Sequence, residues 1–419
     1  MSTTAVLGCM WGDEGKAKIT DVLASDAHAV VRFQGGANAG HTIWLEGAKF
    51  VFNTVPSGLL YPDVICILGA GMVIDPFQLL QEMNTLRDQG LQFEGRFFIS
   101  PRAPLVLPLH KTIDAGHEND ANRVKIGTTK RGIGPAYADR TSRVNLLFGD
   151  LFDEEALRAG IANLHRHHYG EVRPIELEET SALLREAAAR LEPCLAPTIY
   201  MMHEMYSAGK NILFEGAQGS LLDVGLGTYP FVTSSHTTMG GIATGSGFPT
   251  RRIDRIVGVY KSYFTRVGEG PFVTELHDET GQRIRDRGHE YGTVSGRPRR
   301  CGWFDAVAAR YTALINGLDE IAFTLLDVLS GFDTLKVCTA YRIDGEQTGR
   351  FPAGASALNR AEPVFEDMPG WQEDITGITR FDDLPQAAQQ YVQAIERLVG
   401  VPVSIVSVGP DRNQTIFRS

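Results

Sequence analysis

Cysteine is scarce in this chain of 419 residues, which holds only five, spread from position 9 to position 338. None of them forms a Cys-x-x-Cys pair, and an odd number at wide spacing shows neither a disulfide framework nor a metal motif. The first residues also lack a basic segment followed by a long apolar run, so no secretory signal is expected. We therefore expect a protein of a reducing compartment, the cytoplasm.

Long hydrophobic runs and an excess of positive charge are missing as well. The longest mostly apolar stretch, residues 64–74, is interrupted by glycines and is too short to cross a bilayer. Asp and Glu number 50 against 40 Lys and Arg, a net charge of −10, which argues against nucleic acid or an acidic membrane as a partner. The local basic clusters are therefore expected to serve a small anionic ligand.

Strand-like and helix-like segments alternate along a chain that is 43% hydrophobic and shows no repeats, low-complexity tracts or flexible linkers. Strands are expected near residues 5–10, 28–33, 64–69, 96–100, 211–215, 255–262, 321–328, 335–341 and 402–407. Helices are expected near residues 76–88, 153–167, 179–208, 303–316 and 384–398. This order predicts the α/β class: a large, mainly parallel central β-sheet flanked by helices, in a single domain of residues 1–419 with helical and loop excursions. The helical excursion is expected at about 151–208.

The segment from Trp11 to Lys16, Trp-Gly-Asp-Glu-Gly-Lys, lies between a predicted strand and a helix start. Such a turn brings backbone N–H groups together at a helix N-terminus, where an anion is stabilised. Lys16 adds a positive charge, and the carboxylate of Asp13 can hold Mg²⁺ or accept a proton. The segment is not a Walker A loop, because Met10 stands where that motif needs glycine and Ala17 where it needs Ser or Thr. An ordinary acidic turn is the competing interpretation.

A second glycine-rich loop, residues 34–42, follows the strand predicted at 28–33. Its glycines let the backbone approach a ligand closely, Asn38 offers an amide for a base edge, and His41 can donate a proton or a hydrogen bond. A lone histidine in a loop is usually a surface residue. Here two glycine-rich loops follow early strands of an α/β pattern, where ligand sites collect, so a binding role is favoured.

Four further segments are rich in hydroxyl, amide or arginine side chains: residues 127–137, 214–220, 227–238 and 292–302. Hydroxyl and guanidinium donors suit phosphate, and the arginines of the last segment favour an anionic small substrate in an acidic protein. A solvated loop is the alternative for the first segment. Asp327, at the end of a predicted strand, can accept hydrogen bonds from guanine, although an Asp there is also a common helix cap.

Eight blocks follow one another along nearly the whole chain: WGDEGK, QGGANAGHT, GTTKRGIGPAY, FEGAQGS, GTYPFVTSS, TRVGEGPF, SGRPRRCGWFD and SVGPDR. They resemble the adenylosuccinate synthetase family, and eight blocks in the family's order are highly specific. The resemblance implies a ligase of AMP biosynthesis that joins IMP and L-aspartate to adenylosuccinate. GTP, with Mg²⁺, first phosphorylates the purine 6-oxygen, and the aspartate amine then displaces that phosphate.

The resemblance also implies roles for individual residues. Asp13 is the base that removes the purine N1 proton, His41 is the general acid beside the transferring phosphoryl group, and one Mg²⁺ per subunit is held by Asp13 and the Gly40 carbonyl. The expected IMP contacts are Asn38, Thr129, Arg143, Gln218, Thr233 and Arg297; the aspartate contacts are Thr293, Ser295 and Arg297; and the GTP contacts are Gly12, Gly15, Lys16, Gly40, Thr42, Arg299, Asp327, Ser407 and Gly409. Arg143 is expected to reach the IMP of a partner subunit, which implies a homodimer.

Four positions depart from the family's pattern. Ala17 and Lys130 stand where glycines are usual, Val294 replaces a threonine of the aspartate loop, and Leu325 replaces a lysine that packs against guanine. Val294 and Leu325 leave open a paralogue that ligates aspartate or a related amine to a modified purine nucleotide, or that uses ATP. A non-catalytic guanine-nucleotide-binding switch is a third hypothesis, which the retained catalytic pair disfavours.

Overall fold

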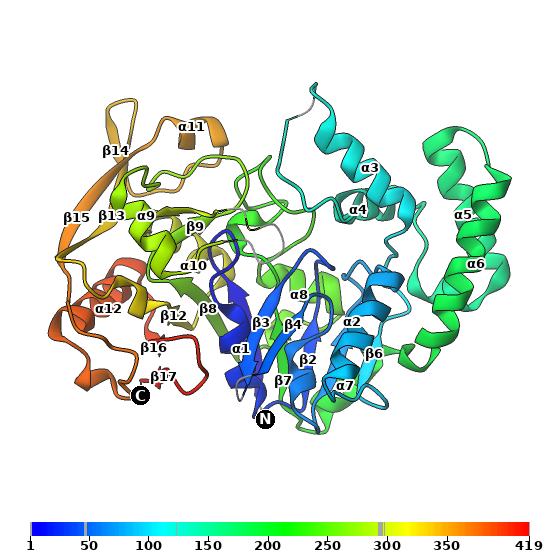
Figure 1. Cartoon of the computed structure of the whole chain (residues 1–419), viewed down its shortest axis with the longest axis horizontal. Coiled ribbons are helices and arrows are strands. Elements are labelled where there is room, and N and C mark those ends of the chain that lie inside the picture. The colour runs from blue at the N-terminus through cyan, green and yellow to red at the C-terminus, as the bar shows by residue number, and fades with distance from the viewer. Residues whose placement is uncertain (1, 46–47, 123, 292–295, 297, 419) are drawn as a thin grey trace.

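A nine-stranded β-sheet runs through the middle of the protein in the computed structural model (Figure 1). The structure describes residues 2–45, 48–122, 124–291, 296 and 298–418. In spatial order the strands are β17 (Thr415–Phe417), β16 (Val403–Ser407), β12 (Glu320–Thr324), β8 (Arg255–Lys261), β1 (Thr3–Gly8), β7 (Ile212–Glu215), β2 (Ala29–Arg32), β5 (Ile65–Leu68) and β6 (Phe97–Ile99). Every neighbouring pair is parallel except β16 and β17. The predicted α/β class with a large, mainly parallel sheet is confirmed.

Helices cover both faces of this sheet because strands such as β1 are buried on both sides. All six residues of β1 are buried. Ala5 and Leu7 belong to the same core cluster as residues of α7 (Thr198–Ser207) and α8 (Met239–Ser246), whereas Val6 packs with α1 (Lys16–Ala24). Successive side chains of a strand point to opposite faces, so an unbroken apolar run indicates a strand that lies between two layers.

Two helices, α5 (Glu154–Tyr169) and α6 (Pro174–Leu191), pack on each other at one end of the molecule, and α6 contacts α2 (Pro76–Asp88) (Figure 1). The single helix predicted over 179–208 is wrong. The helix α6 ends at Leu191, and α7 begins at Thr198 and packs against β7. Pro193 and Pro197 lie in the break, because proline lacks the N–H that a continuing helix needs and its ring clashes with the preceding turn.

The strand predicted at 335–341 belongs to a second sheet rather than to the central one. It is β13 (Thr334–Ile343), which pairs with β11 (Phe304–Asp305), β14 (Glu346–Thr348) and β15 (Glu362–Pro369). Two short pairs join β3 (His41–Leu45) to β4 (Ala48–Phe52) and β9 (Phe264–Arg266) to β10 (Arg300–Gly302). The remaining α-helices are α3 (Pro108–Asn119), α4 (Ile133–Thr141), α9 (Glu279–Arg287), α10 (Ala306–Asn316), α11 (Ala355–Asn359) and α12 (Gln386–Val399).

The carboxyl ends of β1, β2, β7, β12 and β16 share one edge of the sheet because these strands are parallel. The loops that follow them therefore meet at this edge, the usual place for a ligand in an open α/β sheet. No helix within the described part of the chain is long and apolar enough to span a membrane.

Candidate active site

A cleft of about 730 Å³ opens where the loops after β1, β2 and β7 meet, and its wall also includes residues 126–129 and 231–234. The predicted site residues that line it are Gly12, Asp13, Gly15, Lys16, Asn38, Gly40, Thr42, Thr129, Gln218, Thr233 and Arg299. Segments far apart in the chain thus contribute to one cleft.

The other predicted residues do not join this lining. Arg143 is exposed just beyond the end of α4, with a φ of 64°. The predicted GTP contacts Asp327, Ser407 and Gly409 lie around Lys18, as set out below. Thr293, Ser295 and Arg297 fall outside the described residues, as does the side chain of His41.

The loop after β1 folds around the carboxylate of Glu14. This carboxylate accepts the backbone N–H of Met10 at 3.0 Å and that of Gly12 at 2.9 Å, and it forms an ion pair with Nζ of Lys16. Glu14 and Lys16 are both buried. Lys16 therefore lines the cleft with its ammonium already paired, and Glu14, to which the sequence analysis gave no role, shapes the phosphate-binding turn.

Asp13 presents its carboxylate at the cleft from a backbone with a φ of 59°. Its Oδ2 lies 2.8 Å from Nε of Arg299, and Nη1 of Arg299 donates to Oε2 of Glu290 at 2.8 Å. Burial lowers the pKa of Arg299, but the carboxylates of Asp13 and Glu290 raise it by more, so the guanidinium stays charged. The predicted base thus faces the cleft in an ion pair with a predicted GTP contact.

Glu290 supports Arg299 behind the cleft, a position that the sequence analysis did not single out. It is 1% exposed, and its Oε1 accepts hydrogen bonds from Nζ of Lys261 and from the hydroxyl of Tyr263, each at 2.6 Å. Burial and the neighbouring carboxylate raise the pKa of Tyr263 well above its usual value, so the hydroxyl keeps its proton. This network anchors Arg299 from behind. Its signal in the sequence, one acidic residue ahead of an arginine-rich segment, is too common to single out.

Gln218 offers the cleft a buried side-chain amide. Its Nε2 and Oε1 are buried, and neither has a hydrogen-bond partner among the described residues. Its φ of 55° is uncommon for a residue other than glycine. An unsatisfied buried polar group costs about 1–3 kcal/mol, and a sparsely populated backbone conformation about as much again. A ligand edge with both donors and acceptors, such as a purine, would satisfy this amide.

Lys18 links α1 to the loop after β16. Its Nζ donates to Oγ of Ser407 at 2.7 Å and to the carbonyls of Gly409 at 2.7 Å and Gln414 at 2.9 Å. Burial lowers the pKa of Lys18 to about 8, against the opposing effect of nearby carboxylates that include Asp327. Lys18 therefore holds two of the predicted GTP contacts, Ser407 and Gly409, beside α1, although the sequence analysis gave it no role.

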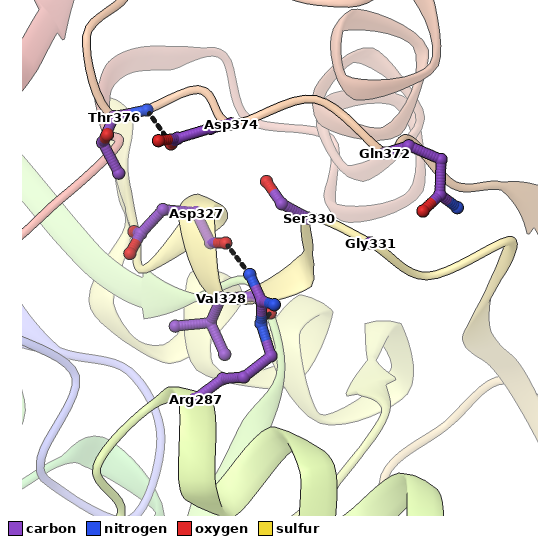
Figure 2. Close-up of a pocket in the computed structure, with 8 residues that line it drawn as sticks. All are labelled: Arg287, Asp327, Val328, Ser330, Gly331, Gln372, Asp374 and Thr376. Atoms are coloured by element: carbon purple, nitrogen blue, oxygen red, sulfur yellow. Dashed lines mark hydrogen bonds between the residues drawn. The ribbon is translucent and has the colours of Figure 1, made fainter.

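A second cavity of about 420 Å³ lies beside Asp327 (Figure 2). Arg287 donates to the backbone carbonyls of Val328 at 2.9 Å and Asp327 at 3.4 Å, which holds the turn after β12. Figure 2 shows the side chain of Asp327 turned away from Arg287. Burial raises the pKa of the Asp327 carboxyl, and Lys18 opposes this effect.

Comparison with known proteins accounts for the clustering of these motifs. A model of the adenylosuccinate synthetase family matches residues 5–416. The chain belongs to this family. It is 48% identical to the adenylosuccinate synthetase of Desulfitobacterium hafniense (strain DSM 10664 / DCB-2) and equally to that of Clostridioides difficile (strain 630), over 100% of this chain and 99% of each relative. It is accordingly a ligase that forms a carbon–nitrogen bond.

Solved structures agree. The fully ligated adenylosuccinate synthetase from Plasmodium falciparum matches with a TM-score of 0.94 and 38% identity, over 100% of both chains. The succinoaminodeoxyadenylate synthetase of cyanophage S-2L, solved with dGMP and with dATP as an energy donor, matches with a TM-score of 0.64 and 22% identity, over 99% of this chain and 95% of that chain. At that identity the second likeness shows the fold alone.

Leu325, which stands where the family usually has a lysine, occupies a turn rather than a strand. The strand predicted over 321–328 ends as β12 at Thr324, and Leu325 has a φ of 55°. Its carbonyl accepts a hydrogen bond from Oγ of Ser262 at 2.8 Å, and its side chain packs against the main hydrophobic core. Leucine therefore gives this turn an apolar side chain and no charge.

Proposed function

We propose that this chain joins IMP and L-aspartate to adenylosuccinate at the expense of GTP, as its family membership indicates. One observation of the structure supports this function above the others. Asp13 lines the same cleft as the amide of Gln218, which lacks a hydrogen-bond partner in the part of the chain that the structure describes. A base and a purine-edge partner therefore face one ligand volume. A nucleotide-binding switch needs no such combination.

The proposed reaction has two steps. Asp13 takes the N1 proton of IMP, the 6-oxygen attacks the γ-phosphorus of GTP, and the bond from that phosphorus to the GDP oxygen breaks. The amine of aspartate then attacks C6, the bond from C6 to the former 6-oxygen breaks, and phosphate leaves with that oxygen and the proton given up by the amine. General acid–base catalysis contributes about 10²–10⁴ to such a rate, and we assign the acid that assists the phosphoryl group to His41.

Arg299 controls the base in this proposal. The guanidinium of Arg299 lies 2.8 Å from Oδ2 of Asp13 and so occupies an oxygen that would otherwise face the purine. Phosphate oxygens of GTP would compete with Asp13 for the N–H donors of the Arg299 guanidinium, which suits Arg299 as a predicted GTP contact. We propose that GTP draws Arg299 away from Asp13, so that the base becomes active only when the phosphoryl donor is bound.

Mg²⁺ fits the oxygen donors near this base. The Asp13 carboxylate and the Gly40 backbone both line the cleft, and Mg²⁺ prefers carboxylate and carbonyl oxygens together with substrate phosphates. These two residues would hold the ion, which when bound neutralises charge on the transferring phosphoryl group. The remaining substrate contacts are proposed as the resemblance implies them, with Arg143 extending to a second subunit; its exposed position away from the cleft supports that assignment.

A single-turnover assay with IMP labelled by ¹⁸O at the 6-position tests the proposal. Released phosphate should carry the label, and its formation should require GTP, with aspartate needed for its release. Unlabelled phosphate would show that water, rather than the purine oxygen, attacks GTP. Omission of IMP is the matched control, since a simple GTPase would still release phosphate.

A paralogue that acts on a modified purine is the second candidate, because Val294 and Leu325 depart from the family's pattern. Substrate pairs discriminate the two. The enzyme should form more product with IMP and GTP than with dGMP and dATP, the pair named for the cyanophage enzyme. Preference for the second pair would establish the paralogue.

A further inference from the structure

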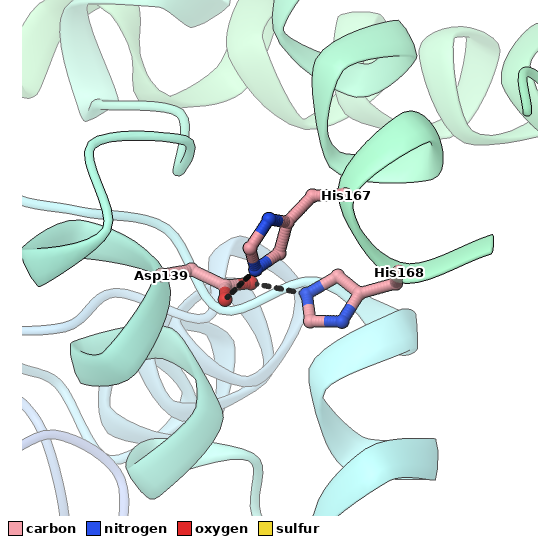
Figure 3. Close-up of side chains that lie close together, drawn as sticks. All are labelled: Asp139, His167 and His168. Atoms are coloured by element: carbon pink, nitrogen blue, oxygen red, sulfur yellow. Dashed lines mark hydrogen bonds and ion pairs between the residues drawn. The ribbon is translucent and has the colours of Figure 1, made fainter. Parts of the chain in front are cut away.

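Histidines surround the carboxylate of Asp139 at the rim of the cleft, in a cluster that the ligation chemistry leaves unused (Figure 3). Asp139 belongs to α4 and its side chain is 3% exposed. Its Oδ2 lies 3.1 Å from Nε2 of His110 and 2.7 Å from Nε2 of His168, and its Oδ1 lies 4.0 Å from Nε2 of His167. One carboxylate therefore meets three imidazoles.

His110 orients this carboxylate from behind. Its Nδ1 accepts the backbone N–H of Leu107 at 2.9 Å, so the ring proton sits on Nε2 and is donated to Oδ2 of Asp139. A fully buried imidazole with both nitrogens engaged in this way is a support and not a free ligand. Hydrogen bonds to the outer face of a ligand group are what hold it in place at metal centres.

His167 and His168 converge although they are consecutive in α5. Neighbouring side chains on an α-helix diverge by about 100° and do not normally face one another. Here the helix ends at once, at Gly170 with a φ of 79°, and Figure 3 shows both rings directed at Asp139. Nitrogens of the two rings and an oxygen of Asp139 lie within 4.8 Å of one another. Oδ1 accepts no hydrogen bond from the rest of the described chain.

We propose that Asp139, His167 and His168 form a binding site for a first-row transition-metal ion of the Zn²⁺ type. Two imidazoles and a carboxylate suit Zn²⁺, whereas Mg²⁺ prefers an all-oxygen shell. Three protein ligands leave a fourth position for water or substrate, as in open zinc sites. That position is accessible, because His167 is 42% exposed and His168 lines the cleft.

The ion would join the end of α5 to α4. The helix α4 begins directly after the segment 127–132, which contains Thr129 of the cleft wall. Occupancy is therefore expected to stabilise the packing of α5 on the main body and to change the KM for IMP more than kcat. The site is separate from the Asp13 and Gly40 oxygens proposed for Mg²⁺.

A calorimetric titration of metal-free, untagged protein with ZnSO₄, in the presence of excess Mg²⁺, tests the proposal. We expect one Zn²⁺ per chain. His167→Gln should weaken that binding at least ~100-fold, the upper range for groups that merely support a ligand. This variant should fold normally, because the His167 ring is partly exposed and its Nε2 lies 4.0 Å from Oδ1 of Asp139, beyond hydrogen-bond distance. His277→Gln, at a histidine that is 81% exposed elsewhere, is the matched control and should bind as the parent does.

Substitution with Co²⁺ adds a spectroscopic readout, since a four-coordinate Co²⁺ site absorbs strongly in the visible range. The parent and His277→Gln should show that absorption, and His167→Gln should lose it. Absence of saturable Zn²⁺ binding in the parent would show that the cluster only joins the two helices by hydrogen bonds and binds no metal. Equal binding by His167→Gln, or equal loss in His277→Gln, would likewise overturn the site. None of these results depends on the ligase reaction, so they stand apart from the proposed function.

Discussion

Asp13→Asn should separate catalysis from folding, because the structure makes this exchange nearly neutral for the backbone. Asp13 has a φ of 59°, a region that asparagine enters more readily than most residues. The exchange keeps the size of the side chain and removes its charge and basicity. Arg299 does not become an unpaired cation, since it keeps Glu290 as a partner at 2.8 Å.

The expected magnitudes differ widely. The Asp13 side chain is 36% exposed, so its ion pair with Arg299 is screened by solvent and contributes at most about 1 kcal/mol to stability. Removal of a general base costs about 10²–10⁴ in rate, which corresponds to roughly 2.7–5.5 kcal/mol of transition-state stabilisation. We therefore expect a protein that melts close to the parent and binds GTP, yet turns over at least ~100-fold more slowly.

Asp344→Asn is the matched control. Asp344 has a φ of 53° and an arginine partner, Arg360, at 3.0 Å, but it lies in the β13–β14 turn. The Asp-Gly turn becomes Asn-Gly, which hairpins also favour. The assay is adenylosuccinate formation in a single turnover, beside thermal melting and an intact-mass check of both variants. Near-parental turnover of Asp13→Asn would remove Asp13 from the mechanism, and a slow Asp344→Asn would show that the assay reports folding.

Three further predictions concern binding and stability. Leu325→Lys should lower the KM for GTP while ATP stays a poor substrate, because Asp327 accepts hydrogen bonds from donors that adenine lacks at that edge. Initial rates with GTP and with ATP test this prediction, and equal use of ATP by the parent would refute it. Because the pKa of Lys18 is lowered to about 8, its charge is present below that pH and lost above it, so the parent's KM for GTP should rise as pH increases through 8. Lys18→Met should show a raised KM that no longer varies there, and a persisting pH dependence would assign it to another group. Glu290→Gln should deprive the buried Lys261 of its counter-charge and destabilise the protein by about 3 kcal/mol, seen as a lower melting temperature; an unchanged melt would contradict the network.

Local chemistry in the sequence was enough to predict much of the fold and the loops of the site. The apolar run over residues 5–10 predicts a buried parallel strand because both of its faces must meet other layers, and the observed strand β1 begins two residues earlier. Glycines directly after such a strand predict a ligand-binding loop, since parallel strands end at a common edge. Helix ends were less predictable: the break between α6 and α7 depended on two prolines within a continuous helical pattern.

Contacts between distant segments were decided by the tertiary structure alone. The ion pair of Asp13 with Arg299, the anchoring of Arg299 by Glu290, and the bonds from Lys18 to the loop after β16 each join segments that the sheet order brings together. The same holds for Asp139, whose histidine neighbours lie on α3 and at the end of α5. Hydrophobic periodicity reports which face of a segment is buried but not which segment covers it, because many strand orders bury the same apolar area. Only the folded chain, in which one order is realised, determines which charges face each other.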